Sequence, residues 1–196
     1  MRLPVVTVMV LAAFALSGCL DPPDKRPEAD ALRSDVAGMP GVDAAELHYE
    51  KGVALDPADV DLRVRMADDA TTEQVAQVFV AAYDGFLDEH AEEEGNLEVR
   101  WHDDTLELRS FEPRADADDV RAAALAAAGL VGRGRLLAQV TTQDVETEPH
   151  VRTSMWLWLA PGADREALRS ERRALRAAFD DLLLGHVDTR LPRRSR

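Results

Sequence analysis

A short acidic run with one histidine holds the densest group of metal-type ligands in the chain. Residues 88–94 read Asp-Glu-His-Ala-Glu-Glu-Glu. Carboxylate and imidazole groups bind divalent cations, but this spacing is neither the twelve-residue calcium loop nor the His-Glu-x-x-His zinc motif. The remaining histidines, His48, His102, His150 and His186, are scattered. We therefore interpret the run as the solvated end of a helix, and we predict no metal ion and no cofactor.

The side chains that serve nucleophilic catalysis follow no recognisable motif. No serine lies in a Gly-x-Ser-x-Gly sequence, which forms the nucleophile elbow of many hydrolases. The glycines of residues 129–134 follow a predicted helix instead of opening one, so they indicate a helix end and a turn, not a phosphate-binding loop. We predict that the protein is not an enzyme. A cleft with two clustered titratable groups would favour the opposite view.

The single cysteine directly follows an apolar N-terminal segment. Arg2 gives this segment a positive start, and residues 3–16 are apolar over most of their length. A membrane-spanning helix needs about 20 such residues, so the segment is too short to be one. Ser17, Gly18 and Cys19 come next. One cysteine excludes a disulfide within the chain and a zinc site made of several thiolates.

This N-terminus resembles the signal peptides of bacterial lipoproteins, in which the lipobox is a leucine, two small residues and a cysteine. Residues 16–19, Leu-Ser-Gly-Cys, match it at every position. The resemblance implies cleavage between Gly18 and Cys19, a diacylglycerol on the Cys19 thiol and acylation of the freed amine. Several acyl chains anchor a protein durably, so we expect the protein at the extracytoplasmic face of the cell membrane. An ordinary secretory signal with a chance cysteine is the alternative.

Prolines and mixed charge characterise residues 20–41. Such a segment is expected to be a tether that is extended at its prolines, although a short helix over residues 29–36, packed on the domain, is an alternative. The expected organisation is a signal peptide (1–18), a lipidated cysteine and flexible tether (19–41), one domain (42–191) and a basic tail (192–196). With Arg190, the tail has four arginines that could contact anionic headgroups or simply be solvated.

Period-two alternation of apolar and polar residues predicts strands with one buried and one hydrated face. It is clear in residues 62–66, 97–102 and 106–109, and it is typical of an antiparallel or mixed sheet. An Asp103-Asp104 turn is expected to join two of them. Further strands are expected at residues 135–142 and 150–159, with weaker candidates at residues 45–50 and 186–191.

Three helices are expected between these strands. Thr71 and Gln74 have the spacing of a capping box, and an apolar stripe over residues 75–87 follows. Asp116 is expected to cap an alanine-rich second helix, and Asp164 a third helix whose arginines face water.

The three passages from strand to helix resemble one another. Residues 62–86 align without gaps on residues 155–179, and residues 111–120 align on 159–168. Two explanations account for this similarity equally well. The chain could contain three copies of one repeated unit, or any alternation of strands and similarly capped helices could align in this way. We predict an α+β domain with one antiparallel or mixed sheet of six to seven strands, three helices on one face, and ferredoxin-like strand–helix–strand units. This analogy of element order carries no function with it.

The face of the sheet opposite the helices is the most promising surface for binding. If Met155, Leu157 and Leu159 face the helices, the alternate residues face the other way; these are Trp156 and Trp158, together with Arg63, Arg65, Arg100 and Arg109. Tryptophans beside arginines could hold a partner strand, a glycan ring or an anionic ligand. We favour the alternative that the N-terminal segment covers the tryptophans and that the charges form cross-strand pairs.

The strong negative charge limits the possible partners. Residues 1–18 contain Arg2 and no acidic residue, so the mature chain has 22 basic and 37 acidic side chains, a net charge of −15. Such a surface repels phosphate backbones, and we expect no nucleic acid partner. We predict a membrane-anchored lipoprotein that binds or scaffolds an envelope protein or glycan; a solute-binding lipoprotein with its ligand on the open sheet face is the alternative, and an envelope enzyme is less favoured. The sequence does not indicate an oligomeric state.

Overall fold

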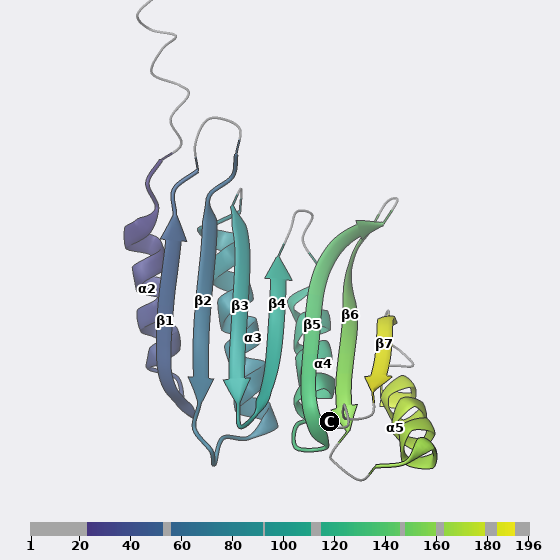
Figure 1. Ribbon diagram of the computed structural model, residues 1–196. Helices are drawn as coiled ribbons and strands as arrows, with labels where there is room; N and C mark the ends of the chain where they lie inside the picture. The colour runs from purple at the N-terminus through teal and green to yellow at the C-terminus, as the bar shows by residue number, and fades with distance from the viewer. Residues whose placement is uncertain are drawn as a thin grey trace, which may run out of the picture.

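The protein is an α+β domain built on one sheet, as the sequence predicted (Figure 1). The computed structural model describes residues 23–52, 56–91, 93–110, 115–145, 148–159, 163–178 and 184–190. In these residues seven strands form a mixed sheet in sequence order: β1 (Val42–Glu50), β2 (Asp59–Met66), β3 (Glu94–Trp101), β4 (Asp104–Ser110), β5 (Gly134–Val145), β6 (Glu148–Leu159) and β7 (Leu184–Arg190). The described helices are α2 (Arg26–Ala37), α3 (Thr72–Asp88), α4 (Ala117–Ala128) and α5 (Arg165–Ala178).

The helix α2 corrects the predicted tether of residues 19–41 and the predicted count of three helices. Ala29, Leu32 and Val36 are buried against the domain, and they lie at the spacing of one helix face. Pro27 lies in the first turn, where a missing N–H breaks no helical hydrogen bond. The alternative of a short packed helix is therefore the correct one for this segment.

Parallel and antiparallel pairs alternate across the sheet. The parallel pairs β2–β3, β4–β5 and β6–β7 are each connected through a helix, and antiparallel pairs join them. The ferredoxin-like character of these units is not confirmed, because the two parallel strands of each unit are direct neighbours. A ferredoxin-like fold has split units with another strand between the two.

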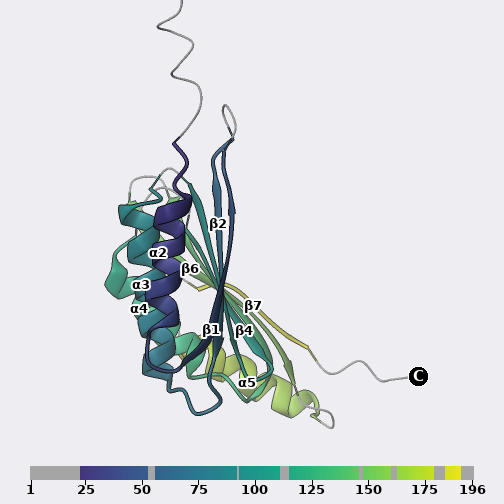
Figure 2. The same cartoon turned by 90° about the vertical axis from the view of Figure 1, so that its left-hand side faces the viewer.

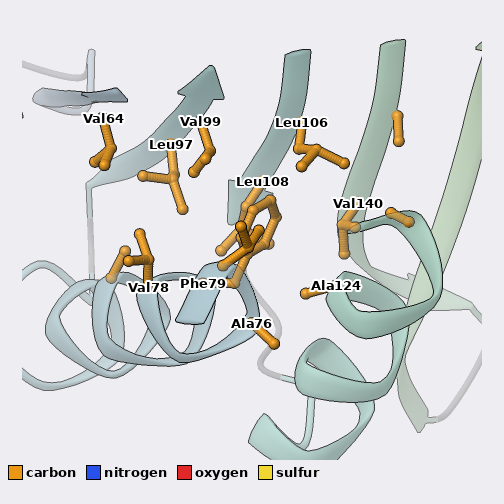
Figure 3. Close-up of a cluster of buried hydrophobic side chains, with 14 of the residues drawn as sticks. Val64, Ala76, Val78, Phe79, Leu97, Val99, Leu106, Leu108, Ala124 and Val140 are labelled. Atoms are coloured by element: carbon orange, nitrogen blue, oxygen red, sulfur yellow. The ribbon is translucent and has the colours of Figure 1, made fainter. Parts of the chain in front are cut away.

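The helices cover one face of the sheet. In Figure 2, α2, α3 and α4 lie side by side on the same face. The helix α5 reaches the same face at β7. Thr189 of β7 pairs in register with the buried Leu157, so its side chain lies on the helix-covered face. Arg172 Nε of α5 donates a hydrogen bond to Thr189 Oγ1 at 3.2 Å. Figure 3 shows Phe79 of α3 in the core beside Leu108 of β4. Each such large side chain contributes roughly 1.5–3 kcal/mol through burial.

The predicted helix caps are confirmed. Thr71 Oγ1 accepts from Gln74 N at 3.2 Å, and Thr71 N donates to Gln74 Oε1 at 2.8 Å, which completes the capping box of α3. Asp116 accepts from Asp118 N at the start of α4. Asp164 accepts from Glu166 N and Ala167 N before α5, and these two hydrogen bonds hold the pKa of its carboxyl below the ordinary value.

A buried aspartate joins the β3–β4 turn to the start of β5. The turn is formed by His102 and Asp103, since Trp101 pairs with Asp104; Asp104 is therefore the first residue of β4. Its carboxylate accepts from Leu136 N at 2.6 Å and Gly132 N at 2.8 Å, and it is 2% exposed. Two backbone donors that would otherwise lack partners are thus satisfied.

We predict that Asp104→Ala lowers the free energy of unfolding by about 2–3 kcal/mol, because it removes two charge-assisted hydrogen bonds and leaves buried N–H groups unpaired. The neighbouring Asp103 is exposed, so Asp103→Ala is a matched control with an expected change within about 0.5 kcal/mol. Urea unfolding of both variants measures the difference. Equal stability of the two variants would contradict the role assigned to Asp104.

Candidate functional site

The six side chains that the sequence analysis places opposite the helices do lie on that open face of the sheet. Their neighbours in sequence, among them Leu62, Val64, Val99 and Leu157, are buried under the helices. The four arginines (Arg63, Arg65, Arg100 and Arg109) are exposed, while Trp156 and Trp158 are half-buried. No described helix packs on this face, so the described part of the chain leaves it open.

The sheet separates the tryptophans from these arginines. Arg65, Arg100, Leu137 and Trp156 lie in one row of register across β2, β3, β5 and β6. At about 4.8 Å per strand, Trp156 is about 14 Å from Arg100 and about 19 Å from Arg65. The predicted surface therefore has two parts on one face: an arginine region on β2–β4 and a tryptophan patch on β5–β6.

In the arginine region most of the guanidinium groups are paired. Arg65 Nε lies 2.7 Å from Asp43 Oδ2 across strands. Arg100 Nε lies 2.5 Å from Glu98 Oε1, and Arg109 Nη2 lies 3.7 Å from Glu107 Oε2, each within one strand. The expected cross-strand pairing thus holds for Arg65 only, and exposed pairs of this kind contribute about 0–1 kcal/mol.

Arg63 is the exposed arginine of this region with no ion pair or hydrogen bond to the described residues. It lines two shallow depressions, of about 260 Å³ over β2–β4 and about 150 Å³ over β1–β3. Its guanidinium is accordingly available to an anionic group of a partner.

The tryptophan patch includes two residues that the sequence analysis did not single out. Leu137 lies directly opposite Trp156, and Arg135 directly opposite Trp158. The Arg135 guanidinium carbon is 5.9 Å from the Trp158 ring centroid, within the range of a cation–π contact. Alternation in residues 135–142 places Arg135 and Leu137 on the open face, but only the register makes them neighbours of the tryptophans.

The described part of the N-terminal segment, from residue 23 on, does not provide the cover that the sequence analysis favoured for the tryptophans. From Arg26 on, the segment forms α2, which packs over β1 and β2 on the opposite face of the sheet (Figure 2). In the described part of the chain, the tryptophan patch therefore lies open, with Trp156 and Trp158 half-buried in the sheet surface.

A second constellation lies at the end of α3, within the acidic run. His90 is 1% exposed, and its Nδ1 is hydrogen-bonded to Glu93 Oε2. The Tyr49 hydroxyl donates to Glu93 Oε1 at 3.2 Å. The interpretation of this run as a solvated helix end is correct for the exposed Asp88 and Glu89 but wrong for His90, because the chain turns back here into β3 and encloses the imidazole. Local composition does not predict such a buried His–Glu pair, because it does not show how the chain turns after the helix.

Tyr49 connects this cluster to the start of α2. Its hydroxyl oxygen accepts from Lys25 N at 3.1 Å, its carbonyl accepts from Arg26 Nη2 at 3.1 Å, and the Arg26 guanidinium carbon lies 5.4 Å from the ring centroid. Burial raises the pKa of the Tyr49 phenol above 10.0, and the charge of Glu93 adds to the effect. Since a raised pKa favours the neutral phenol, the hydrogen bond that the hydroxyl donates to Glu93 is complete at pH values below 10 and is lost as the pH rises through the shifted pKa.

The chemistry open to the His90 cluster is limited. His90 Nε2 is buried and has no hydrogen-bond partner, so no solvent-borne substrate reaches it in this conformation. Within the described residues, no group of three or more histidine, cysteine or carboxylate side chains has the geometry to hold a metal ion. The hydrogen bonds of the cluster connect β1 to the segment between α3 and β3.

The predicted lipidation site and the basic tail cannot be placed. Gly18, Cys19 and residues 191–196 lie outside the described residues. None of the described helices combines the length and the apolar character that crossing a membrane requires.

The sequence matches no protein-family model and no curated protein.

We predict that Tyr49→Phe loosens α2, because Lys25 N and Glu93 each lose a hydrogen-bond partner. Amide exchange over residues 23–37 should become about tenfold faster, which corresponds to the roughly 1.4 kcal/mol of a lost buried network. Tyr83→Phe is the control: it removes the 2.8 Å bond to the Ala115 carbonyl elsewhere in the core. Hydrogen exchange with mass spectrometry compares the two variants, and unchanged protection of α2 in Tyr49→Phe would contradict the prediction.

Proposed function

We propose that the protein is a lipoprotein, anchored through Cys19 at the extracytoplasmic face of the cell membrane, whose domain binds an envelope partner through its open sheet face. The lipobox of residues 16–19, placed at the end of an apolar segment too short to span a membrane, is the observation that carries the anchoring. The mature charge of −15 leaves the domain little direct attraction to anionic lipid, so attachment requires an anchor of this kind.

The described chain favours a domain held close to the lipid. Lys25 is fixed by the hydrogen bond of its N–H to Tyr49 and by that of its Nζ to the Glu89 carbonyl at 2.7 Å. Five residues lie between Cys19 and Lys25, so the six extended Cα–Cα steps between them span at most about 22 Å. The end of the sheet that contains Tyr49 would then face the bilayer, and the open face would stand beside it, accessible to other envelope components.

The open face supports the binding half of the proposal. A sheet of seven strands that is covered on one side only leaves its second face free for a partner. This face presents the unpaired Arg63 and the half-buried Trp156 and Trp158. Tryptophan and arginine are the residue types most often responsible for affinity in protein interfaces.

The anchoring is tested by growing cells with radioactive palmitate. We expect label on the wild-type protein and none on Cys19→Ala, since the acceptor thiol is gone. Trp156→Ala retains Cys19 and should be labelled like the wild type. An unlabelled wild-type protein, or equal label on Cys19→Ala, would refute the anchor.

A solute-binding role is the second candidate, and the geometry of the tryptophan patch favours it. Leu137, Trp156 and Trp158 offer a flat apolar surface, and Arg135 contacts its rim. An apolar surface with a guanidinium beside it suits a sugar ring with an anionic substituent, because aromatic faces accept apolar ring surfaces while arginine binds carboxylate or phosphate.

Titration of tryptophan fluorescence with soluble peptidoglycan fragments tests this role. We expect a shift that is lost in Trp156→Ala and in Trp158→Ala. It should persist in Trp101→Phe, since the buried Trp101 lies on the helix side of β3. No spectral change with any fragment, or a change that persists in both patch variants, would remove support for this site.

A further inference from the structure

A groove between α2 and α3 combines an apolar floor with an acidic rim. Its volume is about 420 Å³. The floor is lined by small and apolar side chains: Ala31, Leu32, Val36, Met39 and Ala81. The rim consists of four exposed carboxylates: Asp35, Asp84, Asp88 and Glu89. The lining residues include no lysine or arginine.

The two helices are in close contact at Gly85, which lines the groove beside Leu32. A Cβ atom at Gly85 would lie 2.6 Å from Leu32 Cδ1, so a larger residue there would require the Leu32 side chain to shift. Partial burial raises the pKa of the Asp84 carboxyl, and the charge of Asp88 raises it further. A cationic group in the groove would relieve this unfavourable pairing of carboxylates.

The chain has a matching basic segment at its C-terminal end. Residues 190–196 read Arg-Leu-Pro-Arg-Arg-Ser-Arg, and nine of the 23 lysines and arginines of the chain lie within residues 165–196. Leu191 is apolar and the arginines are cationic, so the segment has both kinds of group that the floor and the rim of the groove would accept.

This segment is too short to enter the groove of its own domain. The segment follows Arg190 at the end of β7. The groove lies over β2, because α2 packs on β1 and β2 while α3 packs on β3 and β4. Five strand spacings separate β2 from β7, about 24 Å in the plane of the sheet alone. Six extended residues span at most about 22 Å, and α4 lies on the same face between the two.

We propose that the C-terminal residues 191–196 of one copy bind in the α2–α3 groove of a second copy. Leu191 contacts the apolar floor, and the arginines pair with the carboxylates of the rim. The interface is head-to-tail: each copy offers one segment and one groove, so that assemblies grow beyond two subunits unless geometry closes them. This inference goes beyond the proposed function and does not depend on lipidation.

Sedimentation velocity of three forms of the full chain tests the assembly. Asp84→Asn/Asp88→Asn weakens the groove, and truncation after Arg190 removes the segment. We expect the wild type to associate as its concentration rises, the truncated chain to remain monomeric, and Asp84→Asn/Asp88→Asn to need about three- to tenfold higher concentrations to associate. An equimolar mixture of the two altered forms should give dimers, because together they restore one intact interface. A monomeric wild type, association of the truncated chain like that of the wild type, or a mixture that remains monomeric would each overturn the proposal.

Fluorescence anisotropy of a labelled peptide of residues 189–196 tests the chemistry. Asp84→Asn/Asp88→Asn should weaken its binding about three- to tenfold, the effect of two exposed ion pairs. Asp68→Asn/Asp69→Asn makes the same change of charge at two exposed residues before α3 and should leave binding unchanged. If the two double variants weaken peptide binding equally, the peptide is attracted only to an acidic protein in general, and the proposed site is overturned. Binding of the peptide to phosphatidylglycerol vesicles but not to the protein would also overturn it. Neutral amides at Asp84 and Asp88 remove a repulsion, so far-UV circular dichroism and thermal unfolding should show an intact fold.

Discussion

Burial on one face only is the constraint on which the rest of this structure depends. Along β2, β3 and β4, buried side chains that are mostly apolar alternate with more exposed polar ones, and the buried set is covered by helices. A sheet of this kind needs helices on the side of its apolar face. Each parallel pair of strands is joined by a crossover connection, and the helix in that connection covers the pair. The other face must then remain compatible with water, and long arginine side chains serve this purpose because their stems cover the sheet while their charges are hydrated.

The same constraint explains why α2 is part of the domain. The strand β1 is the first of the sheet, and no crossover helix precedes it within the strand–helix–strand units. Leu47 of β1 and the neighbouring β2 would present apolar side chains to water if α2 did not pack over them. The contacts of Tyr49 with Lys25, Arg26 and Glu93 hold this helix at its first residues, where the chain arrives from its N-terminal segment.

Local patterns predicted the elements of this fold well. Alternation identified the strands around Leu62, Leu97 and Leu106, and side-chain oxygens at Thr71, Asp116 and Asp164 identified the helix starts, because both signals depend only on near neighbours in sequence. A tether was preferred to the helix α2 because the prolines of residues 20–41 are typical of a linker. The single proline within α2, Pro27, is harmless in a first turn.

Relations between distant residues were not predictable in this way. The separation of Trp156 from Arg65 depends on strand order, and the contact of Arg135 with Trp158 depends on register. Neither quantity is encoded in the alternation itself, since a strand shows the same pattern wherever it lies in the sheet. The burial of His90 likewise depends on how the chain turns after α3 and on Tyr49, 41 positions earlier in the sequence.

The sequential strand order has a consequence for how the chain acquires its structure. Every strand pairs only with the strands just before and after it in sequence. No pairing therefore spans more than one crossover with a single helix, and the entropy lost at each closure stays moderate. Folding can proceed progressively from either end, with each new unit using the previous one as its template. A chain with this topology that emerges gradually from its N-terminus, as every polypeptide does during synthesis, can thus fold as it appears, without waiting for its last residues.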